Sequence, residues 1–163
     1  MKRVGVISDT HGSVSAEVQA FLQACDEVWH AGDVGNEPTL DAWMRFKPLT
    51  AVYGNIDDWR VRARLSEVAV FQCEGCKVMM THIGGYPAHY APGIAARLRQ
   101  EKPDIFVAGH SHILKVMRDD THGLMYFNPG AAGDSGFHKL KTALRFKIDG
   151  KRLYDLEVFE MPR

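Results

Sequence analysis

The segment VGVISDTHG, residues 4–12, decides the fold, because a β-branched run from Val4 to Ile7 ends abruptly at the polar residues Asp9 and His11. Four later segments repeat this arrangement of a strand-like run followed at once by residues that can bind metals: Gly32-Asp33, Gly54-Asn55, Thr81-His82 and Gly109-His110-Ser111-His112. In an open α/β sheet, the loops at the carboxyl ends of the strands converge on one crevice, where ligands bind. We therefore expect these five segments to meet in space.

Helical patterns separate the strand-like runs of the first half. Apolar residues recur at helical spacing from Val14 to Cys25 behind Ser13, the expected N-cap, and again through Leu40 and Trp43. Strands that alternate with helices imply right-handed crossovers and a largely parallel sheet. Later strands read as antiparallel, with a hairpin across Asp149-Gly150 in the type I′ pattern. The chain predicts a single domain over residues 1–163, of α/β (α+β) class, with two packed sheets and helices outside.

Composition narrows the possible partners. Of the 163 residues, 20 are basic and 20 acidic, so a net charge of zero gives no basic field for nucleic acid. No stretch approaches the roughly 20 apolar residues of a membrane span, and the first residues lack a signal-peptide core. We expect a cytoplasmic protein without a membrane partner. No sequence feature identifies a homo-oligomer, although exposed aromatic residues or strand edges could support one.

The three cysteines point to structure rather than redox chemistry. An odd number of cysteines indicates reduced thiols. Cys73 and Cys76 have redox or half-zinc-site spacing, but they lie between two strand-like runs, so we interpret them as thiols flanking a Glu-Gly hairpin turn. A mononuclear metal or redox protein built on this pair, or on Asp9 and His11 alone, would leave the other strand-end residues unexplained.

The residue types at the strand ends favour a transition metal. Imidazole combined with carboxylate suits zinc, manganese, iron, cobalt or nickel, whereas calcium and magnesium prefer oxygen ligands. The candidate ligands are too many for one tetrahedral ion but suit two ions that share a carboxylate, which has two oxygens. Gly32, Gly54 and Gly109 each precede a candidate ligand, where glycine permits positive φ or close backbone approach. The seven candidate metal ligands are Asp9, His11, Asp33, Asn55, His82, His110 and His112.

Taken in order, these five motifs resemble the signature of the calcineurin-like metallophosphoesterases, and the short chain is similar to their small microbial phosphodiesterase branch. The resemblance extends from Val4 to about Gly130. It implies a two-sheet β-sandwich flanked by helices, and two divalent metal ions, manganese being expected and zinc, iron, nickel or cobalt being alternatives. It further implies that the first ion is held by Asp9, His11, Asp33 and His112, and the second by Asp33, Asn55, His82 and His110.

The same resemblance implies hydrolysis of a small phosphate ester by in-line attack of a hydroxide that bridges the metals. Asp33, as the bridge, Asn55 and His82 are the expected catalytic residues. Two divalent ions bring four positive charges, against one negative charge each on Asp9, Asp33 and the hydroxide. The remaining positive charge neutralises a phosphodiester monoanion, so we expect a phosphodiesterase rather than a monoesterase.

Two positions depart from the family pattern. Many relatives have His directly after the Gly-Asn pair, where it protonates the leaving group, but this chain has Ile56. Many small relatives also have a second His two residues after the His82 position, where this chain has Gly84; we interpret the nearby His89 as a surface residue. Asp57 is a further catalytic candidate that either orients a ligand histidine or is simply exposed.

Two interpretations stay open at this level. Asn128-Pro129-Gly130 either lies on the rim of the site or forms a plain turn. A non-catalytic scaffold with the same fold is the main alternative to an enzyme, because the retromer complex contains a phosphoesterase-like subunit whose role is to bind partner proteins. All seven ligand positions are filled here, which favours the enzyme.

Overall fold

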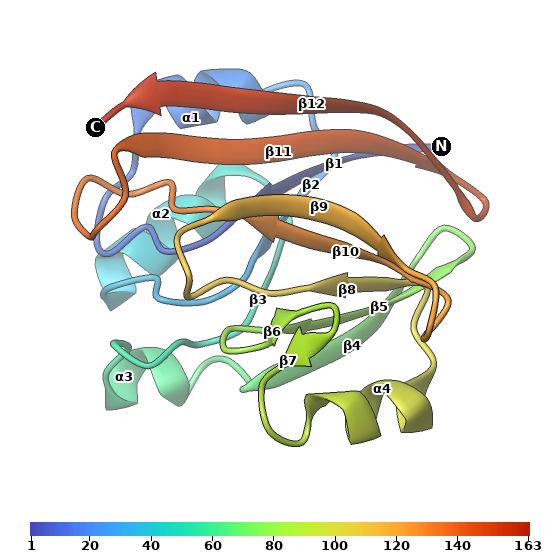
Figure 1. The fold of residues 1–163 in the computed structure, drawn as a ribbon. Helices are drawn as coiled ribbons and strands as arrows, with labels where there is room; N and C mark the ends of the chain where they lie inside the picture. Colours follow the sequence, from blue (N-terminus) through green and yellow to red (C-terminus); the bar gives the residue numbers. More distant parts are fainter.

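Two five-stranded sheets pack face to face in the computed structural model, which describes residues 1–163 (Figure 1). The first sheet has the order β12-β11-β1-β2-β3. Its strands β1 (Lys2–Ile7), β2 (Glu27–His30) and β3 (Leu49–Ala51) are parallel. The late strands β11 (Leu140–Asp149) and β12 (Arg152–Pro162) extend this sheet in antiparallel fashion beyond β1.

The second sheet has the order β4-β5-β8-β10-β9. Its centre is parallel, with β5 (Cys76–Thr81), β8 (Ile105–Val107) and β10 (Leu124–Pro129), and its edges β4 (Val68–Cys73) and β9 (Leu114–Asp119) are antiparallel. A small hairpin of β6 (Gly85–Tyr86) and β7 (His89–Tyr90) forms a separate two-stranded sheet. The expected two-sheet fold is confirmed.

Alternation along each strand builds the layers. Val4 and Val6 of β1 and Val107 of β8 belong to the main apolar core, which both sheets share. The next residue along each strand belongs to an outer cluster: Ile7 joins the side chains of α1 and α2, and Ala108 joins those of α4. A strand places successive side chains on opposite faces, so strands buried on both sides are apolar at nearly every position.

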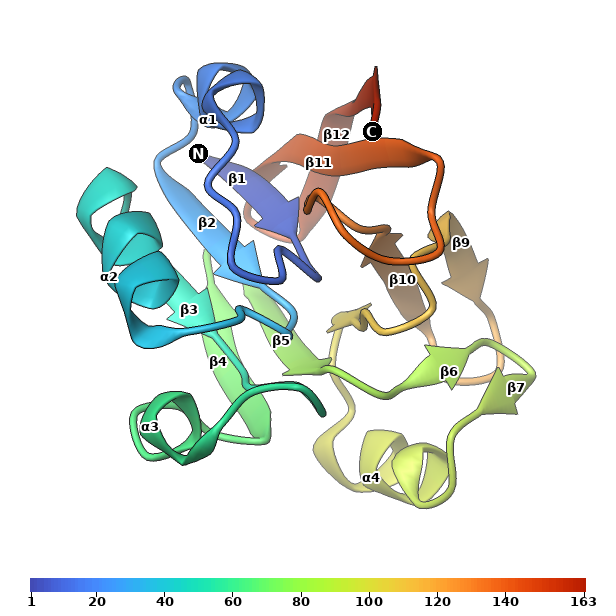
Figure 2. The same cartoon turned by 90° about the vertical axis from the view of Figure 1, so that its left-hand side faces the viewer.

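Four helices flank the sheets: α1 (Ala16–Leu22), α2 (Glu37–Phe46), α3 (Trp59–Arg62) and α4 (Ile94–Glu101). Figure 2 shows α1 and α2 outside the first sheet and α4 outside the second. No helix has both the length and the apolar composition needed to cross a membrane.

Two local predictions need correction. The N-cap of α1 is Ser15, whose Oγ accepts from the Val18 amide, whereas Ser13 Oγ donates to the Thr10 carbonyl instead. The β11–β12 turn has Gly150 and Lys151 at its centre, since Asp149 still pairs with Arg152. Only Gly150 of these two has positive φ, so the turn lacks the second positive φ of the type I′ pattern.

Candidate metal centre

The loops that follow β1, β2, β5 and β8 meet at one end of the sandwich, where the arrowheads of β1, β2 and β5 point toward a common region in Figure 2. Contacts there join residues that lie far apart in the sequence. His112 Nε2 is 3.0 Å from Asp9 Oδ1, and His82 Nε2 is 3.2 Å from Asp33 Oδ2. Carboxylates from the first sheet therefore face histidines from the second.

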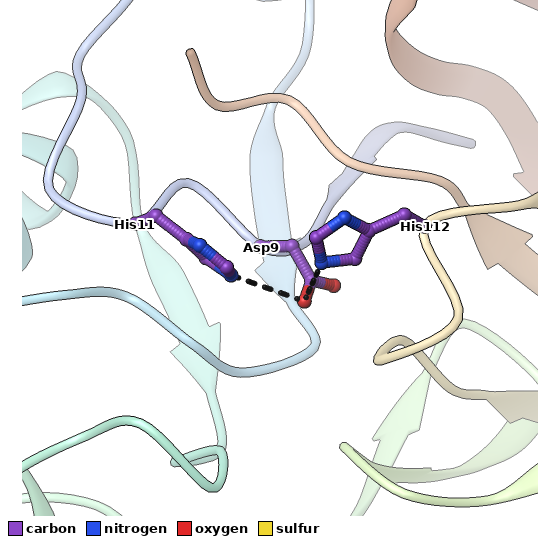
Figure 3. Close-up of side chains that lie close together, drawn as sticks. All are labelled: Asp9, His11 and His112. Atoms are coloured by element: carbon purple, nitrogen blue, oxygen red, sulfur yellow. Dashed lines mark ion pairs between the residues drawn. The ribbon is translucent and has the colours of Figure 1, made fainter. Parts of the chain in front are cut away.

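Asp9 lies at the centre of the first group of side chains. Its fully buried carboxylate lies between His11 and His112, whose Nε2 atoms are 3.4 and 3.0 Å from Oδ1 (Figure 3). The other oxygen, Oδ2, accepts hydrogen bonds from Ser8 Oγ at 2.5 Å and the His110 amide at 3.1 Å. Oδ2 is thus fixed by protein donors, which leaves Oδ1 to face the histidines.

In Asp33 too, one carboxylate oxygen accepts a backbone hydrogen bond and the other faces histidines. Oδ1 accepts the Ile56 amide at 3.0 Å, while Oδ2 lies 3.3 Å from His11 Nε2 and 3.2 Å from His82 Nε2. His11 Nε2 is consequently within 3.4 Å of both carboxylates. This shared position connects the two groups.

The hydrogen-bond arrangement fits a cation between these atoms. His82 Nδ1 lies 2.7 Å from the Ala31 carbonyl, which can only accept, so in neutral His82 the proton is on Nδ1 and Nε2 carries a lone pair. That lone pair faces the carboxylate of Asp33, another acceptor. Asp9 Oδ1, His11 Nε2 and His82 Nε2 are all buried without a hydrogen-bond partner, which is costly unless a cation neutralises them.

Ligand atoms close enough to share an ion form two groups: Asp9, His11 and His112, and Asp9, Asp33 and His82. Asn55 and His110, also expected as ligands, are exposed beside these groups. His110 Nδ1 lies 3.1 Å from Asn55 Oδ1, and the His110 and His82 rings are 5.3 Å apart. The structure thus gathers five of the predicted residues in two clusters and places the other two in mutual contact at their open side.

The ionisation of the cluster suits cation binding. Burial raises the pKa of Asp9, but the contacts with the His11 and His112 rings outweigh the effect of burial and hold that pKa well below its usual range. For Asp33 burial is likewise outweighed, by His11 and His82, and its pKa is also lowered. Asp33 and then Asp9 raise the pKa of His11 to about 9. Both acids are therefore ionised, and a metal ion would displace the proton that His11 holds in their field.

Backbone strain is concentrated on the candidate ligands themselves. Nine residues other than glycine have positive φ, and five of them are candidate ligands: Asp9, His11, Asp33, His110 and His112. This left-handed conformation is uncommon outside glycine and persists only where surrounding contacts enforce it. Here the Asp9 amide donates to the Gly32 carbonyl at 2.9 Å, and the His11 amide donates to the Asp33 carbonyl at 3.0 Å. The two loops hold each other in this conformation.

The glycines before the ligands are explained mainly by close approach. A Cβ at Gly32, where φ is +100°, would lie 2.7 Å from His82 Nδ1. A Cβ at Gly54 would collide with Asp33 Oδ1, and one at Gly109 would collide with Ser8 Oγ. Of these three glycines, only Gly32 has positive φ, so the expected left-handed conformation lies mostly one residue later, on the ligands.

The calcineurin-like phosphoesterase superfamily domain matches residues 1–151 of the chain. The chain belongs to this superfamily. Its members are typically dimetal-dependent, in agreement with the two groups of candidate ligands. Superfamily membership also supports a hydrolase.

Solved structures share the fold over nearly the whole chain. A single mutant of Vps29 from Entamoeba histolytica has a TM-score of 0.78 at 19% identity, and the match covers 99% of each chain. Wild-type Vps29 from the same organism, in complex with Zn²⁺, has a TM-score of 0.75 at 19% identity over 98% of each chain. An archaeal phosphodiesterase has a TM-score of 0.77 at 17% identity, over 96% of this chain and 99% of its own. No curated protein sequence matches.

The structure explains one departure of this calcineurin-like chain from its family pattern. A side chain at Gly84 would have its Cβ 2.8 Å from both Ala108 Cβ and Phe106, so a second histidine has no room there. His89, exposed on the β6–β7 hairpin and in ring contact with Tyr86 at 4.8 Å, is a surface residue as expected. Ile56 is 47% exposed next to Asn55 and offers no proton.

Asp57 fits neither predicted alternative. It is buried, and its oxygens accept the amides of Val34 at 3.2 Å, Gly35 at 2.8 Å and Gly54 at 2.9 Å, with no bond to a histidine. Asp57 therefore ties the loop that carries Asp33 to the loop that carries Asn55 through their backbones.

Sequence reasoning missed His30 and His138, which support this phosphoesterase site, and left Asn128 open between the rim of the site and a plain turn. His30 is fully buried: the Gly32 amide donates to its Nδ1 at 3.1 Å, so its Nε2–H donates to Thr10 Oγ1 at 2.9 Å, and burial lowers its pKa to about 4. Asn128 Nδ2 donates to the Gly109 carbonyl and Ser111 Oγ, both at 3.1 Å, so this segment braces the rim and is more than a turn. The second missed residue, His138, contacts His112. A histidine inside a buried strand was the one available signal, and it applied only to His30.

Proposed function

We propose that this protein is a cytoplasmic, dinuclear metal-dependent phosphodiesterase that acts on small phosphate esters. The observation that carries the proposal is the set of buried, unpartnered atoms Asp9 Oδ1, His11 Nε2 and His82 Nε2, which face one another across the two sheets. Such an arrangement is unfavourable without cations, and membership of a phosphoesterase superfamily supplies the matching chemistry.

In this proposal Asp9, His11, Asp33 and His112 hold the first ion, and Asp33, Asn55, His82 and His110 hold the second. His11 and His82 both lie within 3.4 Å of Asp33 Oδ2, which supports Asp33 as a shared ligand. Asp9 is the residue common to the two groups of ligand atoms close enough to share an ion, so its Oδ1 is a second candidate for the shared position. The mixed oxygen and nitrogen donors suit manganese, with zinc, iron, nickel or cobalt as alternatives. The zinc complex of Vps29 shows that a protein of this fold binds such an ion.

A pair of divalent ions bound at this site supplies a hydroxide nucleophile near neutral pH and positive charge for the phosphate. The chain determines what surrounds that chemistry. The carboxylates of Asp9 and Asp33 offset only part of the charge of the ions, which favours a diester monoanion as substrate. A cavity of about 340 Å³ opens beside Asn55 and His82, and it has room for one of the two ester groups.

The leaving group receives no proton from the position next to Asn55, because Ile56 cannot titrate. General acid catalysis is worth about 10²–10⁴ in rate, so esters of good leaving groups should react faster than alkyl esters by a factor in that range. Measuring kcat/KM for nitrophenyl and alkyl esters of the same phosphate checks this expectation. Equal rates on the two classes would contradict it.

The decisive test combines metal stoichiometry with hydrolysis of bis-nitrophenyl phosphate. The wild type should bind two ions and show manganese-stimulated turnover. Asp33→Asn should lose one ion and about 10²–10³ in kcat, because an amide has one oxygen and no charge to offer two cations. Asp120→Asn, at an 87% exposed carboxylate paired with Arg118 away from the loops, is the matched control and should behave as wild type.

A non-catalytic binding scaffold is the alternative that the structural neighbours favour, because Vps29, a retromer subunit, matches the chain from end to end. A scaffold would bind metal without manganese-stimulated turnover. Two bound ions with no hydrolysis of aryl or alkyl esters would therefore replace the enzyme with the scaffold.

A further inference from the structure

His112 presents one ring nitrogen to the candidate metal centre and the other to a second histidine. Its Nε2 lies 3.0 Å from Asp9 Oδ1, while its Nδ1 lies 3.2 Å from Nδ1 of His138. The two rings meet edge to face at 5.1 Å between centroids. His138 is only 8% exposed, and no expected metal ligand lies in its own loop.

The hydrogen bonds of His138 determine where its proton lies. Its Nε2 is 2.7 Å from the Gly133 carbonyl, an obligatory acceptor, so Nε2 carries a proton. In a neutral ring the remaining nitrogen, Nδ1, is then an acceptor. His112 must donate from its own Nδ1 to that acceptor, and its Nε2 is left with the lone pair that a metal ligand requires.

The loop that carries His138 is built against the site. A Cβ at Gly136 would lie 2.7 Å from His112 Nδ1 and 3.0 Å from His138 Nδ1, so only glycine lets the chain pass this close to the pair. A Cβ at Gly133 would lie 2.7 Å from the Asp9 carbonyl, which places the acceptor of the His138 proton directly on the β1 loop. Lys141 reinforces the segment through an ion pair of 2.9 Å with Asp134.

We propose that His138 is the positioning residue of His112: it holds the ring in place and keeps its proton on Nδ1, so that Nε2 is available to the first metal ion. This inference rests on the proposed metal centre. His82 is oriented in the same manner by a backbone carbonyl, that of Ala31. For His112 the chain uses a neutral imidazole, itself anchored to a carbonyl, in place of the usual carboxylate or carbonyl.

Substitution of His138 separates positioning from packing. His138→Phe keeps the ring volume and removes the acceptor, so one of the two ions should bind about 10- to 100-fold more weakly. His138→Asn retains an oxygen that can accept from His112 Nδ1, and should restore affinity to within a few-fold of wild type. His122→Phe is the matched control, since His122 makes an equivalent ring bond of 2.8 Å to Asp119 at the far β9–β10 turn.

Calorimetric titration of the metal-stripped proteins with MnCl₂ measures both affinities without any substrate. Nitrogen-15 NMR of the zinc-loaded wild type reports which nitrogen of His112 carries the proton, and Nδ1 is expected. Wild-type affinity in His138→Phe, equal weakening in His138→Asn, or a proton on His112 Nε2 would each overturn the proposal. Two bound ions without ester hydrolysis would refute the phosphodiesterase alone, because the manganese affinities would still test the role of His138.

Discussion

Asp57→Asn should lower the free energy of unfolding by more than Asp58→Asn, the same change at the neighbouring residue. Oδ2 of Asp57 accepts two amides, Val34 and Gly54, and Oδ1 accepts a third, Gly35. An asparagine has one acceptor oxygen, so turning that oxygen toward the first two amides points its NH₂ at the third. One hydrogen bond is lost, and the other two are made to an uncharged acceptor.

The magnitude follows from those three bonds. A hydrogen bond to a charged group contributes about 1.5–3 kcal/mol and a neutral one about 0.5–1.5 kcal/mol. Loss of one bond and weakening of two others should lower the free energy of unfolding by about 3–5 kcal/mol. Since small proteins are stable by about 5–15 kcal/mol, Asp57→Asn takes away a large part of the total.

Urea unfolding of the metal-free proteins, followed by tryptophan fluorescence, measures the effect. Asp58→Asn is the control: Asp58 is the exposed N-cap of α3, accepts the amides of Arg60 and Val61, and can be replaced by Asn, itself a good N-cap, at little cost. Asp57→Asn should also weaken manganese binding, because Asp57 joins the Asp33 and Asn55 loops. A loss of stability no greater than that of Asp58→Asn would refute this reasoning.

Three further predictions concern other residues around the site. Gly32→Ala should lower the free energy of unfolding by at least about 1 kcal/mol more than Gly123→Ala. Both glycines have positive φ, but only a Cβ at residue 32 meets a neighbour, the His82 ring. Equal losses of stability for the two variants in urea unfolding would contradict the close approach. The free energy of unfolding of the metal-free protein should fall by up to about 3 kcal/mol as the pH falls from 6.5 to 4, because burial lowers the pKa of His30 from 6.5 to about 4. The unfolded chain then binds the proton first, so the stability present above pH 6.5 is lost below it. His30→Gln should remove this part of the pH dependence, and an unchanged profile would show that His30 is not buried as a neutral ring. Ile56→His should raise kcat/KM for alkyl esters by at least about tenfold and leave kcat/KM for nitrophenyl esters nearly unchanged, because only the poor leaving group needs a proton. Equal gains on both ester classes would show that the new histidine does not protonate the leaving group.

The fold could be predicted where the sequence repeats a simple period. Val4 and Val6 against Ile7 follow the alternation of a doubly buried strand, and the same holds for Ile105 and Val107 against Phe106. Short elements escaped prediction because tertiary contacts define them. The four residues of α3 depend on the Asp58 cap, and the β6–β7 hairpin depends on Gly85 at a φ of +74°.

The candidate site divides in the same way. Ligand positions could be read from strand ends, because the path of the chain there is fixed by the sheet. Supporting residues could not: Asp57 bonds to amides more than 20 residues away, and His138 reaches His112 across 26 residues. Both contacts depend on the course of loops, for which residue type alone gives no rule.

The left-handed ligands have an evolutionary consequence. Each non-glycine residue held at positive φ costs of order 1 kcal/mol, so a lineage that stopped binding metal would gain stability by replacing Asp9, His11 or His112 with glycine or asparagine. Selection for folding alone would therefore erase these side chains. Their joint presence in a backbone that disfavours them is what a demand for the proposed ions would maintain, and glycine at these positions in a relative would mark a protein released from that demand.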